Sequence, residues 1–117
     1  MATILIADDE SPIVALLRDL LEEEGHTVLA AHNGREALAL ARVEHPDLVL
    51  SDVMMPLMDG VQLARMLRDE AITREVVVIL MSAAPPPALA AVGAAAFLAK
   101  PFDLDEVNRL IVRHVAP

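Results

Sequence analysis

The chain has 117 residues, of which 56% are hydrophobic, and its formal net charge is -9 at pH 7. This length and composition suit one globular domain with a substantial core and exclude a chain too polar to fold. The acidic balance makes nucleic acid and membrane lipid unfavourable as direct partners. The absence of cysteine excludes disulfides and thiolate metal sites and, with no secretory signal expected, favours a cytoplasmic location.

Short apolar runs alternate with segments of helical periodicity, which predicts five strands and five helices. The expected strands, in chain order, are residues 3–7, 27–31, 47–53, 76–82 and 94–99. Between the first two strands we expect a helix with Ser11 as its N-cap and Pro12 in its first position. Gly25 is expected to end that helix in a left-handed conformation.

The second helix is expected to follow Asn33 and to end before Pro46, and the third to begin after Asp59. Three consecutive prolines at 85–87 precede the fourth helix, which is therefore expected to be short or irregular. The last helix is expected to begin at Asp103 with a capping-box-like start. This alternation of strands and helices predicts a doubly wound parallel sheet.

Residues 76–99 contain no charged side chain and are long enough to span a bilayer. The prolines interrupt this segment near its middle, and its apolar strength lies in two short blocks. Two buried strands joined by a loop and a short helix are therefore the favoured interpretation over a membrane span.

Polar side chains lie at the carboxyl ends of four predicted strands. Asp8 and Asp9 follow the first strand, Asp52 ends the third, Ser82 ends the fourth, and Lys100 follows the fifth. A parallel sheet gathers these ends at one edge, where ligands bind in open α/β sheets. At each position alone the simpler alternative is an ordinary polar residue at a strand end.

Three acidic side chains at one edge repel each other, so positive charge is required beside them. Lys100, the single lysine beside eight arginines, supplies one charge, and Mg²⁺ suits a site of oxygen ligands. A metal ion, an ammonium group and a hydroxyl together are suited to holding a phosphoryl group. No glycine-rich phosphate loop occurs, which argues against a nucleotide site.

The sequence resembles the receiver domain of bacterial two-component response regulators over essentially its whole length. The resemblance rests on ILIADDE, PDLVLSDVMMPLMDG, Ser82 with Ala83, and GAAAFLAKPF, in that order. It implies a flavodoxin-like five-stranded parallel sheet of strand order 2-1-3-4-5 with five helices. We expect a single receiver domain over residues 1–117 without an output domain.

The resemblance also implies a role for each acid at the sheet edge. Asp52 would accept a phosphoryl group from a sensor histidine kinase or a phosphotransfer protein. Asp9 would bind Mg²⁺ directly and Asp8 largely through water, with Asp52 and the backbone carbonyl of Met54 as the remaining protein ligands.

By the same resemblance, Lys100 would hold one phosphoryl oxygen and Ser82 would turn toward another. Phe97 matches the switch aromatic that turns inward as Ser82 moves, although it lacks the hydroxyl of the commoner tyrosine. The bond between Lys100 and Pro101 matches a peptide bond that is usually cis. The domain would be a phosphorylation-activated switch that catalyses its own phosphorylation and dephosphorylation, and would not be an enzyme acting on a separate substrate.

The distance in sequence from Ser82 to Lys100 is about four residues shorter than is usual in the family, about one helical turn. Because the fourth helix is expected to be shortened, the sequence does not decide whether the output is a downstream protein target or a homodimer. The shortened helix also motivates an alternative, a receiver-like interaction module that works without phosphorylation. A magnesium-dependent phosphatase is disfavoured, because no second aspartate directly follows Asp52.

Overall fold

The computed structural model describes residues 1–115, and within them five parallel strands alternate with five helices. The strands are β1 (Thr3–Ala7), β2 (Thr27–Ala31), β3 (Leu48–Asp52), β4 (Val77–Ser82) and β5 (Ala96–Ala99). The helices are α1 (Ser11–Glu23), α2 (Gly34–Glu44), α3 (Gly60–Asp69), α4 (Leu89–Val92) and α5 (Leu104–His114). The strand order is β2-β1-β3-β4-β5, which confirms the predicted flavodoxin-like topology. The last two residues of the expected domain, 116 and 117, lie outside the described residues.

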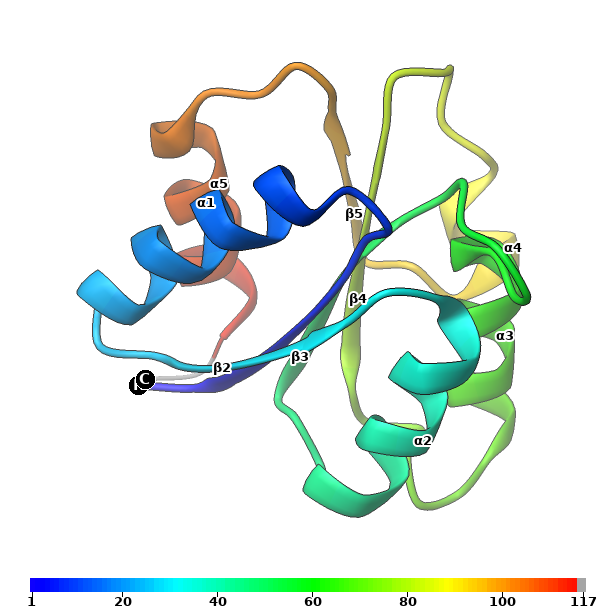
Figure 1. Ribbon diagram of the computed structural model, residues 1–117. Helices are drawn as coiled ribbons and strands as arrows, with labels where there is room; N and C mark the ends of the chain where they lie inside the picture. Colours follow the sequence, from blue (N-terminus) through cyan, green and yellow to red (C-terminus); the bar gives the residue numbers. More distant parts are fainter. Residues whose placement is uncertain (116–117) are drawn as a thin grey trace.

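Helices cover both faces of the sheet, with α1 and α5 on one face and α2, α3 and α4 on the other (Figure 1). Side chains alternate between the faces of a strand. Ile4 and Ile6 of β1 therefore join the core beneath α1 and α5, whereas Leu5 and Ala7 join the core beneath α2 and α3. Burial on both faces explains why the strands are continuous apolar runs with little alternation.

The start of α1 differs from the prediction. Glu10 occupies the N-cap position in an extended conformation, and Ser11 is the first helical residue. The backbone N–H of Glu10 donates to Oδ1 of Asp8 at 2.9 Å, a local turn that sets the backbone before the helix begins. Pro12 lies in the first turn, and Gly25 has the left-handed conformation expected after the helix, with φ of 92°.

Residues 76–99 form β4, α4 and β5, so the bilayer interpretation of this segment is wrong. No helix among residues 1–115 is both long and apolar enough to cross a membrane. As predicted, α4 is short and comprises four residues. Arg68 of α3 holds it by donating from Nη1 to the carbonyl of Ala91 at 3.2 Å.

Two glycines hold the connection from β3 to α3, the segment that directly follows Asp52. The N–H of Gly34 donates to the carbonyl of Met58 at 3.0 Å, and that of Gly60 to the carbonyl of Val53 at 2.8 Å. A Cβ atom at Gly60 would lie 2.3 Å from the carbonyl oxygen of Asp52. Only glycine therefore allows the backbone to pass this close to the end of β3.

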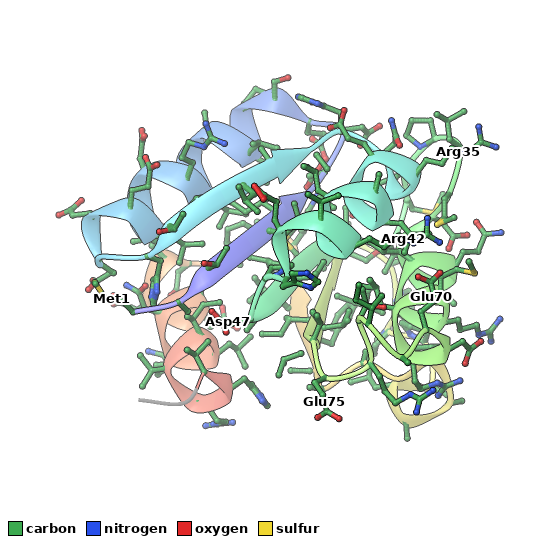
Figure 2. All side chains as sticks on the ribbon, turned by 90° about the horizontal axis from the view of Figure 1, so that it is seen from below. Met1, Arg35, Arg42, Asp47, Glu70 and Glu75 are labelled. Carbon is green, nitrogen blue, oxygen red and sulfur yellow. The ribbon has the colours of Figure 1, made fainter. Side chains whose placement is uncertain are left out.

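At the opposite end of the strands from Asp52, exposed polar contacts join neighbouring elements. Oδ2 of Asp47 accepts from the N–H of Thr3 at 2.8 Å, which joins the starts of β1 and β3. Arg42 of α2 donates to both carboxylate oxygens of Glu70, just beyond α3 (Figure 2). The hydrogen bond from Arg42 holds the pKa of Glu70 below its usual value. Exposed pairs of this kind contribute little to stability.

We predict that Gly60→Ala destabilises the protein by about 1–3 kcal/mol, because the added methyl group overlaps the carbonyl oxygen of Asp52. Urea denaturation measures the loss. Arg65→Ala, at an exposed position of the same helix, serves as the control and should change stability by less than about 0.5 kcal/mol. An unchanged denaturation midpoint for Gly60→Ala would show that the backbone relaxes freely here.

Candidate functional site

The carboxyl ends of β1, β3, β4 and β5 meet at one edge of the sheet (Figure 1). A pocket of about 250 Å³ opens there. Its lining residues come from the strand ends and the loops that follow them: Glu10, Asp52, Met54, Ser82, Ala83, Ala84 and Lys100. Four residues expected at this edge, Asp8, Asp52, Ser82 and Lys100, are thus brought together by segments distant in sequence.

Lys100 lies among three carboxylates. Its Nζ donates to Oδ2 of Asp8 at 2.9 Å and to Oε1 of Glu10 at 3.2 Å, and it lies 3.5 Å from Oδ1 of Asp52. The side chain of Asp8 is fully buried, and that of Asp52 is 7% exposed. One ammonium group cannot offset three carboxylates, so the pocket retains an excess of negative charge.

Burial and the neighbouring charges together shift the pKa values of Asp52 and Lys100. Burial is the main cause that raises the pKa of Asp52, and the charge of Asp8 raises it further against the opposing effect of Lys100. Burial lowers the pKa of Lys100, but its hydrogen bond to Asp8 and the neighbouring carboxylates outweigh burial and raise the pKa above its usual value. Lys100 therefore stays charged, whereas ionisation of Asp52 is less favourable in the folded protein than in water.

The acid arrangement differs from the expectation in one respect. Within residues 1–115, the acids that each place one carboxylate oxygen within 4.8 Å of the others are Asp8, Glu10 and Asp52. Asp9 is exposed, although its charge still contributes to raising the pKa of Asp52. Direct metal binding by Asp9 remains a prediction. Glu10 was missed as a site residue, although the run of three acids after β1 was a signal that could have indicated it.

The donor set fits a hard divalent cation. Carboxylate oxygens are the ligands that Mg²⁺ prefers, and Met54 adds a backbone segment to the same pocket while its side chain is 71% exposed. The unbalanced negative charge around Lys100 favours such an ion. The residues present are therefore chemically suited to magnesium.

Ser82 lines this pocket at the end of β4, and Phe97 lies on the neighbouring strand β5. Ser82 is 4% exposed, and its Oγ accepts from the N–H of Ala84 at 3.1 Å, which leaves its hydroxyl proton available to another acceptor. Phe97 is half-buried and packs against the core beneath α2, α3 and α4. The Lys100–Pro101 peptide bond is cis, as the resemblance implied.

We predict that Asp52→Asn raises the melting temperature at pH 7 by a few degrees when divalent cations are chelated. This rise corresponds to an increase of about 1 kcal/mol in the free energy of unfolding. Because the folded state raises the pKa of Asp52, its ionised form opposes folding. The gain should shrink as the pH falls from the raised pKa through the ordinary value of 3.8, since Asp52 is then protonated in both states. Thermal unfolding followed by circular dichroism checks this, and a less stable variant at pH 7 would contradict it.

Comparisons with known proteins agree with this geometry. The model of the response regulator receiver domain matches residues 4–112. The alkaline phosphatase synthesis transcriptional regulatory protein PhoP of Bacillus subtilis is 40% identical over 107 residues, which are 90% of this chain and 45% of that protein. Sporulation initiation phosphotransferase F of the same organism is 34% identical over 114 residues, which are 96% of this chain and 92% of that protein. This chain thus spans less than half of the first relative and nearly all of the second.

Among solved structures, the receiver domain of sensor histidine kinase PA1611 from Pseudomonas aeruginosa superposes with a TM-score of 0.88 at 26% identity. The match covers 97% of this chain and 96% of that one, and that structure holds a magnesium ion coordinated in its active site cleft. The family model, the sheet topology and these relatives all indicate a receiver domain. The chain belongs to the response regulator receiver domain family, the phosphorylation-activated switches of two-component systems.

Proposed function

We propose that Asp52 is the residue that accepts the phosphoryl group. The observation that carries this proposal is a nearly buried carboxylate at the end of β3, with Lys100 Nζ at 3.5 Å and Ser82 lining the same pocket. An ammonium and a hydroxyl in one pocket can supply donors to the charge that develops during transfer. Asp52 is the nearly buried acid that lines this pocket together with both of them.

Transfer is a displacement at phosphorus. One oxygen of Asp52 forms a bond to phosphorus while the bond from phosphorus to the donor nitrogen breaks, and the electron pair stays on the imidazole of a donor phosphohistidine. In hydrolysis, water adds at phosphorus, the bond to Asp52 breaks, and the carboxylate is regenerated as phosphate leaves with the proton. Both steps depend on positioning and electrostatics, so the domain catalyses its own phosphorylation and dephosphorylation.

We assign the magnesium site to the same acids. Asp8, Asp9 and Asp52 with the backbone carbonyl of Met54 would hold the ion, and Glu10 is a further carboxylate within reach. When bound, Mg²⁺ neutralises the charge on the transferring phosphoryl oxygens. The magnesium ion in the related PA1611 receiver domain supports this assignment.

The switch follows from the new charge on Asp52. The phosphoryl group carries about −1.5 to −2 charges and strong acceptor oxygens, in place of the single negative charge of the free Asp52 carboxylate. The hydroxyl of Ser82, already free to donate, turns toward one of these oxygens, while Lys100 binds another. Phe97 then turns inward into the space that Ser82 leaves, and the loop after β4 changes conformation.

The partners follow from the transfer chemistry. The phosphoryl donor is a sensor histidine kinase or a phosphotransfer protein in the cytoplasm, and the output is a downstream protein target or a homodimer. One relative is named a transcriptional regulatory protein and another a phosphotransferase, which supports roles of these two kinds. The alternative to this switch is an interaction module that works without phosphorylation.

We predict that acetyl phosphate with Mg²⁺ adds one phosphoryl group to Asp52, detected as a mass increase of the intact protein. Asp52→Asn should add none, and a chelator should abolish the reaction. Lys100→Ala should slow phosphorylation by about a hundredfold, because a preorganised donor to the phosphoryl oxygens is lost. Asp69→Asn, an exposed acid on α3, is the matched control and should react like the wild type.

A second measurement separates the two candidate functions. Beryllofluoride with Mg²⁺ mimics the phosphoryl group, and we predict amide chemical-shift changes around Asp52, Ser82 and Phe97 in the wild type but not in Asp52→Asn. An unchanged wild-type spectrum, with no phosphorylation by acetyl phosphate, would replace the switch with the phosphorylation-independent module.

A further inference from the structure

The three carboxylates around Lys100 differ greatly in how easily they can be displaced. The side chain of Asp8 is fully buried and that of Asp52 is 7% exposed, whereas that of Glu10 is 59% exposed. Separating a buried carboxylate from its partner leaves an uncompensated charge in the protein interior. The carboxylate of Glu10 can instead turn into water, where it remains hydrated.

The backbone of Glu10 is fixed even though its side chain is exposed. Its N–H donates to Asp8 at 2.9 Å, and its carbonyl accepts from the N–H groups of Ile13 and Val14 at 3.0 and 3.2 Å. The side chain makes no capping bond to α1 and reaches Lys100 instead. Releasing Lys100 therefore costs no backbone hydrogen bond and leaves the start of α1 in place.

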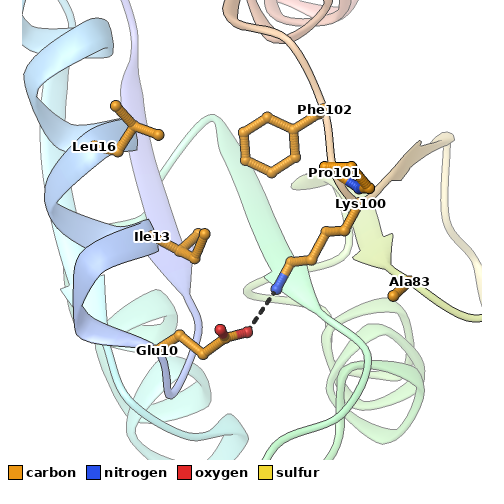
Figure 3. Close-up of a pocket in the computed structure, with 7 residues that line it drawn as sticks. All are labelled: Glu10, Ile13, Leu16, Ala83, Lys100, Pro101 and Phe102. Carbon is orange, nitrogen blue, oxygen red and sulfur yellow. Dashed lines mark hydrogen bonds and ion pairs between the residues drawn. The ribbon is translucent and has the colours of Figure 1, made fainter.

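The contact between Glu10 and Lys100 also lies between two neighbouring pockets. The site pocket of about 250 Å³ shares Glu10, Ala83 and Lys100 with a neighbouring apolar pocket of about 370 Å³. Ile13, Leu16 and Phe102 line that second pocket (Figure 3). The side chain of Glu10 thus lies between the apolar pocket and Asp52.

We propose that Glu10 is a positioning residue that holds Lys100 before phosphorylation and competes with the phosphoryl group for its ammonium. Lysine has three N–H donors, and one oxygen of each of three carboxylates already lies within 3.5 Å of Nζ. Of these acids, Asp8 and Glu10 accept hydrogen bonds from Nζ, and a phosphoryl group on Asp52 would compete for the ammonium with Glu10, the exposed one of the two. This inference rests on the proposed function of Asp52 and adds a residue that restrains it.

The test compares Glu10→Gln with Glu23→Gln, which makes the same change of net charge at an exposed position near the end of α1. The rate of phosphorylation by acetyl phosphate is measured at saturating Mg²⁺. Glu10→Gln should react about two- to fivefold faster than the wild type, the range expected from an exposed ion pair. Glu23→Gln should match the wild type.

A second readout reports the contact itself. Lys100 is the single lysine of the chain, so a ¹⁵N spectrum of the lysine ammonium contains one signal. Glu10→Gln should shift this signal in the unphosphorylated protein, and Glu23→Gln should not. Amide spectra of both variants confirm that they are folded.

The outcomes separate the two proposals. A wild-type protein that takes up no phosphoryl group overturns the function assigned to Asp52, and with it the role of Glu10. Normal wild-type phosphorylation with an equal or slower rate in Glu10→Gln overturns the role of Glu10 alone, and a slower rate would assign Glu10 to magnesium binding instead. An unshifted lysine signal in Glu10→Gln also overturns it.

Discussion

The site depends on the ion pair between Lys100 and the buried carboxylate of Asp8, beside which Asp52 also lies. Asp8 is fully buried and Asp52 nearly so, at the ends of two adjacent strands, where their like charges oppose each other. Without Lys100 from the end of β5, this edge of the sheet would hold unpaired buried charge, which a folded protein rarely tolerates. The ion pair between Lys100 and Asp8 thus connects the end of β5 to the end of β1.

The backbone around this contact is fixed by features that carry no charge. Gly60 lets α3 begin directly against the carbonyl of Asp52, and Gly34 ties the start of α2 to the same loop. The N–H of Lys100 donates to the carbonyl of Ser82, so the two donors to the pocket come from paired strands. Because the supports are backbone groups, the side chains at the site can change partners while the sheet keeps its register.

Much of this could be predicted from the sequence, because the strands are buried on both faces and end in polar residues. The first two strands have the predicted bounds, and the strand order is as expected. The run of three acids placed Glu10 near this edge, but its contact with Lys100 was not predicted, because helix signals favoured Ser11 as the N-cap. Periodicity describes which face a residue occupies, but it does not report where a long flexible side chain reaches.

The segment after Ser82 is suited to carrying a change away from the site. Residues 85–87 are prolines without a backbone N–H, so this loop has few hydrogen bonds to break if Ser82 exchanges Ala84 for another partner. Beyond the loop, the hydrogen bond from Arg68 to Ala91 fixes the four residues of α4 against α3. Under the proposed switch, a movement of Ser82 would therefore reach the largely exposed proline loop before it reaches α4.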